Sequence, residues 1–460
     1  MTLYSDVKAR SLRPVPRVAA AWSIAVMSLM LLVVGETPAL DREPPSDSAE
    51  PGTTNMRQMD MANPEPGQPP VAEPATPVVE SPFIRDSKFS GQLRTYYFDR
   101  KNFNETRNEA WTLGGSIAYQ SGYLDNLFRI GAVGYTSQPL YAPADRDGTL
   151  LLMPGQEGYT VLGQAYGEAR FTDRISGAVG RKAYNTPYIN GNDSRMTPNT
   201  FEGVSVYGTA GAGNDAPAWR FGGGYISKIK ERNSEDFVWM SQAAGASVDR
   251  GVYAAGVNFV NKDFSIGAFN YYSQDIINIF YTDATYALPL ADGHRLKLSA
   301  QYSDQQSTGD NLLTGQSFST SQWGLKGDLG VGAALFTVAY TDTANGANMS
   351  SPWSSYPGYT KVQVEDFNSA GESAVMLRAA YDFSRHGAEG LSAYALWVNG
   401  AGLSANNQNE ADLNIQWTPK EGVLRGTSFQ VRYAHVMQQS AGDPTIDEFR
   451  FIVNYDFPRR

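Results

Sequence analysis

The chain has 460 residues and a formal net charge of −10 at pH 7, with 45 glycines, 12% aromatic residues and no cysteine. An acidic chain is a poor partner for nucleic acid, and a chain without cysteine has no disulfide framework, thiolate metal site or cysteine nucleophile. Glycine weakens helices and aromatic residues favour pleated surfaces, so the composition indicates β structure with many turns.

Residues 1–39 have the pattern of a secretory signal peptide. Four basic residues precede an apolar run over residues 18–35, and the small residues Thr37 and Ala39 suit cleavage. An uncleaved membrane anchor is the alternative, although this run is barely long enough to span a bilayer. Either way, we predict that the rest of the chain leaves the cytoplasm. No later stretch holds 18 consecutive apolar residues, so any further crossing of a membrane must use strands.

Residues 40–85 are rich in Pro, Glu, Ser and Gln, as in the segment PEPGQPPVAEPATPVVESP. Such a composition holds too few periodic apolar residues to pack a core. We predict a disordered or extended tether here.

Residues 86–460 change to runs of about ten residues in which apolar positions alternate with small or polar ones. In the run over residues 428–433, Phe429, Val431 and Tyr433 share one parity, while Ser428, Gln430 and Arg432 share the other. Strict alternation gives a strand two chemically different faces. Ten residues is the length that crosses a bilayer at a tilt, and it exceeds the usual strand of a soluble sandwich.

We count eighteen such runs, and the connections between them alternate in length. Eight connections are short turns, such as 172–174 and 261–263, and most of the others are longer, such as 139–158 and 343–372. Among sheets, only a closed one pairs every backbone group in hydrocarbon. The sequence therefore predicts an all-β fold, an 18-stranded antiparallel transmembrane β-barrel with short periplasmic turns and long outer loops. Tyrosines near the ends of runs, among them Tyr96, Tyr97, Tyr135, Tyr271 and Tyr272, are expected to form girdles at the two membrane interfaces.

The polar parity of these runs carries many cations, and we expect them to face the lumen. They are Arg94, Arg170, Arg220, Lys228, Lys230, Arg295, Lys297, Lys326, Arg378, Arg432 and Arg450. A file of cations that bind weakly can pass an anionic group along a pore. The alternative is that they pair with lumenal carboxylates such as Glu168, Asp328 and Glu448 and only fill a polar interior.

The segment 186–200 (TPYINGNDSRMTPNT) is a Pro-braced loop with a polar centre. Folded into the pore, it would place Asp193 and Arg195 at a constriction. A loop folded outward would have the same composition, so both arrangements stay open.

No catalytic constellation, metal site or cofactor site is evident. The three histidines, His294, His386 and His435, do not lie within metal-ligand spacing of one another, and we expect them to be solvated surface residues.

Three segments resemble the OprD family of substrate-selective outer-membrane porins: FSGQLRTYYFDRKNF, GRKAYNTPYINGNDSRMTPNTFEGVSVYG and DEFRFIVNYDF. The resemblance covers roughly residues 83–457 and implies an 18-stranded barrel in the outer membrane of a Gram-negative bacterium. By position, Asp193, Ser194 and Arg195 resemble the residues of the constriction loop. The resemblance also implies a lumenal basic ladder, to which Arg170, Arg295, Lys297, Arg378, Arg432 and Arg450 are assigned. Phe457 is followed here by three further residues, whereas barrels of this kind usually end on an aromatic residue.

The function expected is passive diffusion of small hydrophilic solutes, with preference for those bearing a carboxylate, such as amino acids and small organic acids. A saccharide channel of the same fold is the first alternative, and a barrel-embedded outer-membrane hydrolase is the second. The expected partners are these solutes, together with outer-membrane lipid and lipopolysaccharide, and the chain is expected to act as a monomer or a homo-oligomer without a cofactor.

Overall fold

A computed structural model describes residues 81–211, 217–403 and 406–457. The predicted signal peptide lies outside these residues, as does the predicted tether except for its last five positions. Within those five, Pro82–Arg85 form the single turn of helix α2, which Ser81 caps. No helix of the described part is long and apolar enough to cross a membrane.

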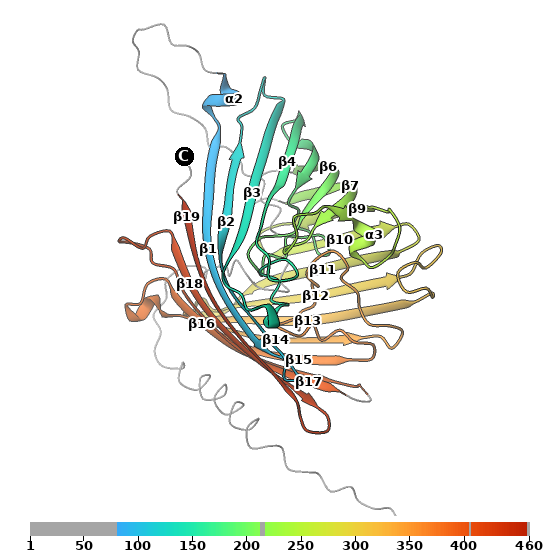
Figure 1. Cartoon of the computed structure of the whole chain (residues 1–460), viewed down its shortest axis with the longest axis vertical. Coiled ribbons are helices and arrows are strands. Elements are labelled where there is room, and N and C mark those ends of the chain that lie inside the picture. The colour runs from blue at the N-terminus through green and yellow to red at the C-terminus, as the bar shows by residue number, and fades with distance from the viewer. Residues whose placement is uncertain (1–80, 212–216, 404–405, 458–460) are drawn as a thin grey trace, which may run out of the picture. The chain divides into compact units, whose positions relative to one another are not determined.

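Long antiparallel strands make up almost all of the described chain (Figure 1). The strands are β1 (Lys88–Lys101), β2 (Arg107–Gln120), β3 (Phe128–Tyr141), β4 (Tyr159–Thr172), β5 (Ile175–Lys182), β6 (Thr200–Gly211), β7 (Ala218–Lys230), β8 (Val238–Trp239), β9 (Val252–Val260), β10 (Phe264–Ser273), β11 (Ile277–Pro289), β12 (Arg295–Gln306), β13 (Ser319–Val331), β14 (Ala334–Thr343), β15 (Ser373–Asp382), β16 (Leu391–Ala401), β17 (Asn407–Trp417), β18 (Thr427–Gln439) and β19 (Thr445–Phe457). A second helix, α3 (Met240–Ala243), lies between β8 and β9.

The sheet closes on itself because its first and last strands pair. Strand β1 pairs with β2 on one side and with β19 on the other, over Gly91–Lys101 and Asp447–Phe457. The two-residue strand β8 belongs to the connection between β7 and β9, which pair directly with each other. Eighteen long strands therefore form the closed barrel, as the sequence predicted, and closure leaves no unpaired edge in hydrocarbon.

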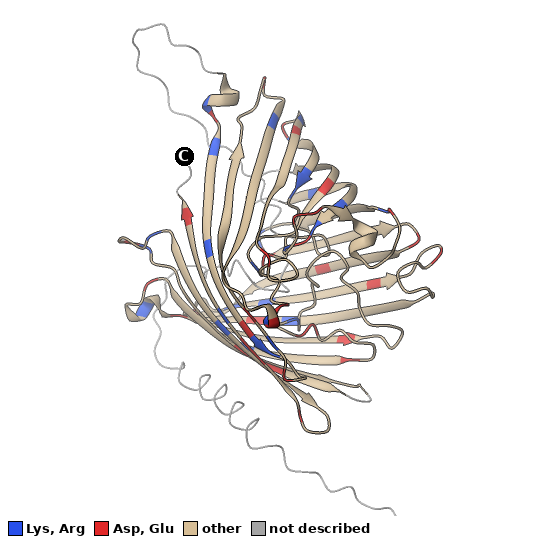
Figure 2. Ribbon diagram, in the orientation of Figure 1, with Lys and Arg blue, Asp and Glu red and all other residues tan. Residues whose placement is uncertain are grey.

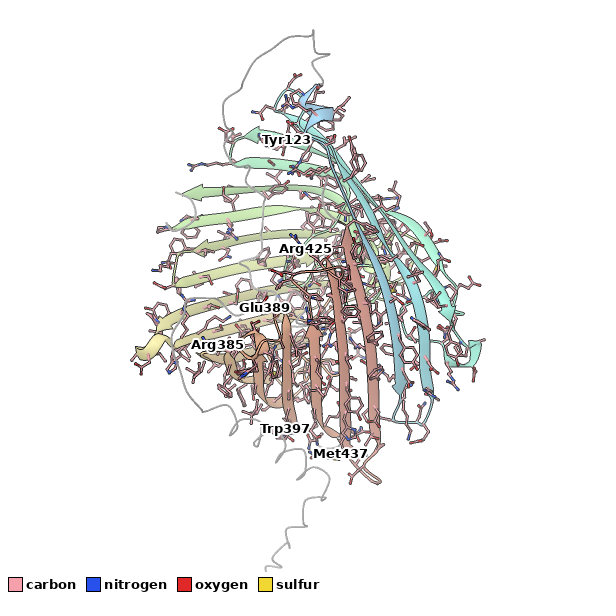
Figure 3. The ribbon with its side chains drawn as sticks, turned by 90° about the vertical axis from the view of Figure 1, so that its left-hand side faces the viewer. Tyr123, Arg385, Glu389, Trp397, Arg425 and Met437 are labelled. Atoms are coloured by element: carbon pink, nitrogen blue, oxygen red, sulfur yellow. The ribbon has the colours of Figure 1, made fainter. Side chains whose placement is uncertain are left out.

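The connections sort by length between the two ends of the barrel. Figure 3 places the turn residues Arg385, Glu389 and Arg425 at one end of strands β16–β18, with Trp397 and Met437 toward the other. The turns on the first side include 173–174 and 261–263, whereas the opposite side carries the loops 142–158, 183–199 and 344–372. Short periplasmic turns and long outer loops orient the barrel in the outer membrane.

Alternation along each strand separates an outward apolar face from an inward polar one. On β19, Phe449 and Phe451 are each 37% exposed, whereas Glu448 and Arg450 are 0% and 2% exposed. Long stretches of the strands carry no charge, and charged positions are spread between them (Figure 2). The inward positions of β12–β14 are hydroxyls and amides such as Ser303, Gln305 and Gln322. The lumenal wall is therefore polar, as in barrels that conduct water-soluble solutes.

The expectation for the tyrosines is wrong in part. Tyr96, Tyr135 and Tyr271 are 1%, 8% and 0% exposed and lie inside the barrel, whereas Tyr272 and Tyr253 face outward at 41% and 61%. Adjacent residues of a strand point to opposite faces, so neighbours such as Tyr271 and Tyr272 cannot both reach the membrane interface.

The largest apolar cluster lies inside the barrel, where loops fill it. Tyr188 of loop 183–199 packs with Trp353 and Tyr356 of loop 344–372 against the inward residues Tyr271 and Tyr281. The inward loops thus replace water with protein across part of the lumen.

Single cysteines test the two faces directly, because the native chain has none. We expect Lys297→Cys, on the inward face of β12, to react with a water-soluble thiol reagent and not with a bilayer-confined one. Val338→Cys, on the outward face of β14, should show the reverse. Labelling of both positions from water would contradict the assignment of faces.

Candidate functional site

The loop between β5 and β6, residues 183–199, crosses the barrel interior. On one side Tyr188 OH lies 2.7 Å from Ser303 Oγ on β12. On the other side Asp193 contacts Arg94 on β1. In the closed sheet β1 lies between β2 and β19, whereas β12 lies between β11 and β13 on the other side of the barrel, so the loop spans the lumen. The open choice between an inward and an outward loop is thereby settled in favour of the inward one.

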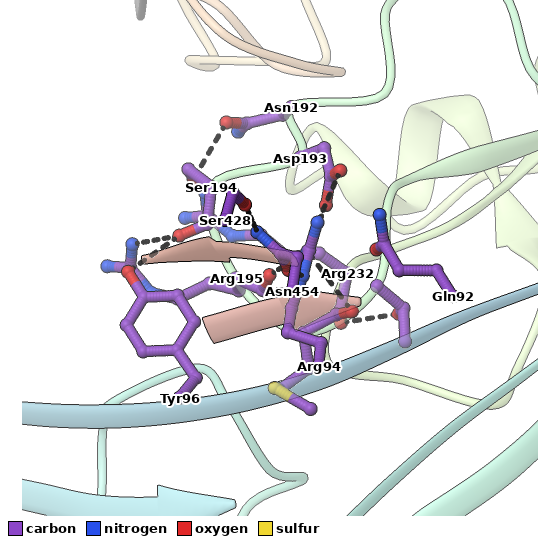
Figure 4. A network of polar contacts seen from close by, with 12 residues as sticks. Gln92, Arg94, Tyr96, Asn192, Asp193, Ser194, Arg195, Arg232, Ser428 and Asn454 are labelled. Carbon is purple, nitrogen blue, oxygen red and sulfur yellow. Dashed lines mark hydrogen bonds and ion pairs between the residues drawn. The ribbon is translucent and has the colours of Figure 1, made fainter. Parts of the chain in front are cut away.

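Arg94 holds the tip of this loop on the barrel wall (Figure 4). Its Nη1 donates to Asp193 Oδ1 at 2.7 Å and to the Arg195 carbonyl at 2.6 Å, and its Nη2 donates to Asp193 Oδ2 at 3.1 Å. Its Nε donates to Asn454 Oδ1 on β19 at 2.8 Å. A guanidinium that donates bidentately to a carboxylate fixes geometry as well as charge, and Arg94 is only 8% exposed. Arg94 therefore sets the position of the loop tip.

Ser194 links the loop tip to a further arginine. Arg232, in the connection after β7, donates from Nη1 to Ser194 Oγ at 2.6 Å, and that hydroxyl donates to Asn192 Oδ1 at 3.1 Å. Tyr96 OH on β1 donates to the Ser194 carbonyl at 3.3 Å. Ser194 thus orients the Arg232 guanidinium through its side chain.

Arg195 is buried at the centre of this group, with 6% of its surface exposed. Its Nε donates to the Thr149 carbonyl at 2.8 Å, and its guanidinium lies 5.0 Å from the ring centre of Phe98. Burial lowers the pKa of Arg195, and the like charges of Arg450 and Arg232 lower it further. Burial, and then the like charges of Arg450 and Arg100, also lower the pKa of the neighbouring Arg232. The region thus holds closely spaced cations.

Cations outnumber carboxylates where the loop tip meets β1 and β19. Arg450 donates from Nε to Glu448 Oε1 at 2.5 Å, and Arg100 donates to Glu448 Oε2 at 2.5 Å. The group comprises five guanidinium groups, from Arg94, Arg100, Arg195, Arg232 and Arg450, and two carboxylates, from Asp193 and Glu448. Counted over these seven side chains alone, five minus two, the net charge is +3, and Asp412 of β17 is a further carboxylate that faces Arg450.

The arginines predicted for β15, β18 and β19 continue from this group along the wall. Arg432 lies directly opposite Arg450 in the register of β18 and β19. Its Nη2 donates to Tyr394 OH on β16 at 3.4 Å, and Arg378 of β15 lies 4.2 Å from the ring centre of Tyr394. Arg378, Arg432 and Arg450 are 7%, 4% and 2% exposed. The structure thus brings these three predicted residues onto one stretch of wall.

The other three predicted ladder residues lie apart from that stretch. Lys297 on β12 pairs with Asp328 at 3.6 Å, and Arg295 is exposed at the start of the same strand. Arg170 on β4 donates to Asn126 Oδ1 at 2.7 Å and lies 3.8 Å from the ring centre of Tyr123. The pairing of lumenal cations with carboxylates, which the sequence left open, accounts for Lys297 and in part for Arg450.

Sequence reasoning did not single out Arg100 and Arg232. Arg100 shares the parity of Arg94, Tyr96 and Phe98, so the alternation of β1 contained the signal. Arg232 lies in a connection, where no periodicity indicates the direction of a side chain.

His435 is not the isolated residue that the sequence suggested. Its Nδ1 lies 2.8 Å from Asp447 Oδ1, to which Tyr433 OH also donates at 2.5 Å. These residues lie on the outward parity of β18 and β19, away from the lumen. In the part of the chain that the structure describes, no Ser, Thr or Cys side chain hydrogen-bonds to His435, and no group of three His, Cys, Asp or Glu residues is arranged to hold a metal.

Comparison with known proteins agrees with this architecture. The model of the outer membrane porin OprD family matches residues 81–459. Porin D of Pseudomonas aeruginosa is 23% identical over 412 residues, which cover 81% of this chain and 91% of that protein. The crystal structure of OccK9 (OpdG) from the same species is 23% identical, has a TM-score of 0.72 and covers 82% of this chain and 99% of its own. OccAB3 of Acinetobacter baumannii is 19% identical, has a TM-score of 0.73 and covers 82% of this chain and 100% of its own.

The chain belongs to the OprD family of outer-membrane porins, because the family match spans most of its length. It is therefore a substrate-specific channel protein of the outer membrane. Its relatives are porins, which points away from an enzymatic function. The resemblance identified from the three sequence segments is confirmed.

Replacing Arg94 tests how the loop tip is held. Arg94→Met keeps the length of the side chain but removes every hydrogen bond to Asp193 and to the loop carbonyls. We expect the loop attachment to lose about 1 to 3 kcal/mol, since Asp193 is half exposed and its charge is screened. The released tip should raise the mean single-channel conductance in planar bilayers.

Arg181→Met is the matched control, because Arg181 pairs with Glu202 on the neighbouring strand, and its loop contact is with Phe237, outside the loop 183–199. Equal conductance of the Arg94→Met variant and the wild type would contradict the role given to Arg94.

Proposed function

We propose that the protein is a passive channel for small hydrophilic solutes and prefers those that carry a carboxylate. The observation that supports this is the net charge of +3 where the β5–β6 loop meets β1 and β19. A cationic passage concentrates anions and lowers their energy as they cross. Asp193, Ser194 and Arg195 are the residues proposed to narrow the passage.

Arg432 is the residue proposed to contact the solute. Its Nε is buried and, among the described residues, has no hydrogen-bond partner. A buried donor without a partner costs free energy, and a carboxylate that reaches it would remove that cost. Arg378 and Arg450, on the same stretch of wall, are proposed to receive the solute from Arg432 or pass it on. Arginine suits this task because its planar fork matches the two oxygens of a carboxylate.

A similar solved structure provides a second support. OpdK of Pseudomonas aeruginosa was crystallised with vanillate, has a TM-score of 0.70 and is 20% identical over 82% of this chain. Vanillate carries a carboxylate on an aromatic ring. We propose that carboxylates of similar size are the solutes of this channel.

A saccharide channel would use neutral hydroxyls and amides instead. The inward face of β12–β14 has such groups, but several already bind the inward loops. Gln305 Nε2 donates to the Ser350 carbonyl at 2.7 Å, and Thr341 and Thr360 hydroxyls lie 2.6 Å apart. These side chains already hydrogen-bond to the loops, which leaves fewer groups to bind a sugar. The arginines therefore support a carboxylate solute more strongly than these side chains support a sugar.

Block of single-channel current by added solutes tests the proposal. We expect benzoate to block wild-type channels and glucose not to block them. Arg432→Gln should raise the half-blocking concentration of benzoate roughly ten-fold, since one charge-assisted contact is worth about 1.4 kcal/mol or more.

The control is Arg107→Gln, because Arg107 pairs with Asp99 on the outward parity of β1. Block by glucose without block by benzoate would favour the saccharide channel and refute the carboxylate proposal.

A further inference from the structure

A second loop lies inside the barrel and is attached to the wall by carboxylates. The loop between β14 and β15, residues 344–372, begins against β12, where the Ser350 amide donates to Gln305 Oε1 at 2.8 Å. It meets the first inward loop through Ser354 Oγ, which donates to the Asn190 carbonyl at 2.7 Å. It then reaches the wall of β17–β19. In the sheet, this wall and β12 lie on opposite sides of β14 and β15, the strands that the loop connects.

Three consecutive backbone amides of this loop point at two carboxylates of β17. The Val364 amide donates to Glu410 Oε1 and the Glu365 amide to Glu410 Oε2, both at 2.8 Å. The Gln363 amide donates to Asp412 Oδ2 at 3.2 Å. Successive backbone N–H groups around one site form an anion-binding concavity, and here the anions are supplied by the barrel wall.

The side chain and carbonyl of Gln363 extend the attachment to β19. Its Nε2 donates to Glu448 Oε1 at 3.0 Å, and Arg450 Nη2 donates to its carbonyl at 3.1 Å. Glu410, Asp412 and Glu448 are 0%, 4% and 0% exposed, so these bonds lie away from bulk water. Glu448 is in addition an ion paired with Arg100 and Arg450, and hydrogen bonds to ionised groups are about twice as strong as neutral ones.

The attached segment borders the arginines proposed to carry the solute. Gln363 contacts Arg450 directly, and Asp412 lies on the inward face of β17, two strands from Arg450 on β19. Lys361 and Asp366 form an ion pair within the loop that closes the segment 361–366 on itself. A shift of this segment would therefore move protein into or out of the passage beside Arg450.

We propose that Glu410 and Asp412 are positioning residues that clamp the β14–β15 loop to the wall of β17–β19 and so hold the channel in one open conformation. When the clamp is broken, the loop leaves the wall and intermittently obstructs the passage. The bonds at Gln305 and Asn190 hold the loop before this segment, and the contact of the Phe367 carbonyl with Gln322 holds it after the segment, so residues 361–366 are the part that moves. The expected effect of the clamp on channel closures rests on the proposed channel function. Its expected effect on the mobility of the loop does not.

Two readouts on refolded, heat-modifiable protein test the clamp. In planar bilayers, we expect the double variant Glu410→Gln, Asp412→Asn to close transiently at a frequency roughly ten-fold higher than the wild type, since the Glu410→Gln change leaves one acceptor oxygen for two loop amides and each variant side chain can turn an NH2 donor toward the loop. In limited digestion with trypsin, we expect faster cleavage after Lys361, whose side chain is 15% exposed in the clamped loop.

A second variant leaves the whole wall intact. Val364→Pro removes one of the two N–H groups that donate to Glu410 and keeps both carboxylates. It should reproduce the faster closures and the faster cleavage. Because the change lies in a loop, it also separates the clamp from any folding defect caused by the double variant.

The control is Glu168→Gln, which removes another buried inward carboxylate. Glu168 binds side chains of Arg129 and Lys182 and no loop backbone, so closures and cleavage should stay at wild-type levels. Wild-type closure and cleavage rates in both clamp variants would overturn the proposal. Faster cleavage at Lys361 in protein that conducts no current would uphold the clamp and refute the channel function.

Discussion

The pairing of every backbone N–H and C=O in hydrocarbon is the constraint on which this structure depends. Pairing of β1 with β19 closes the sheet, and closure makes each strand present one face to lipid and the other to the lumen. The part of the outward face that meets hydrocarbon must then be apolar, and charged residues on the outward parity, such as Asp99 and Arg107, lie near strand ends and are paired. Strand β19 shows this division, because Glu448 and Arg450 occupy its inward face, and Phe449 and Phe451 occupy its outward face.

Two loops fold into the wide barrel and are attached to its wall. The β5–β6 loop is held by the bidentate contact of Arg94 with Asp193, and the β14–β15 loop is held by the carboxylates of β17. In the first case the loop supplies the carboxylate that pairs with the arginine of the wall, and in the second its backbone amides donate to carboxylates of the wall, so each of these buried groups has hydrogen-bond partners. The charge left over is positive and lies beside Arg195 and Arg450, which is the basis of the proposed preference for carboxylates.

The strands were predictable because their pattern has a period. The alternation at 428–433 gave the correct face for Arg432, and the eighteen runs gave the correct strand number. The same rule, applied strictly, would have placed Tyr271 inside the barrel, as its neighbour Tyr272 faces outward. The error came from treating tyrosines near strand ends as a class instead of following the parity of each.

The loops were not predictable in the same way. The segment around Asp193 and Arg195 was recognised as a polar, Pro-braced loop, but its direction depends on Arg94, which lies 99 residues from Asp193 in the sequence. The bonds from backbone amides at 363–365 to Glu410 and Asp412 leave no trace in composition, since any residue except proline has an N–H.

The central claim is that positive charge lines the passage, and the reversal potential of the wild-type channel tests it most directly. Refolded protein in a planar bilayer under a gradient of potassium chloride should show a reversal potential of the sign that indicates anion selectivity. Cation selectivity in open channels of the folded barrel would contradict the account.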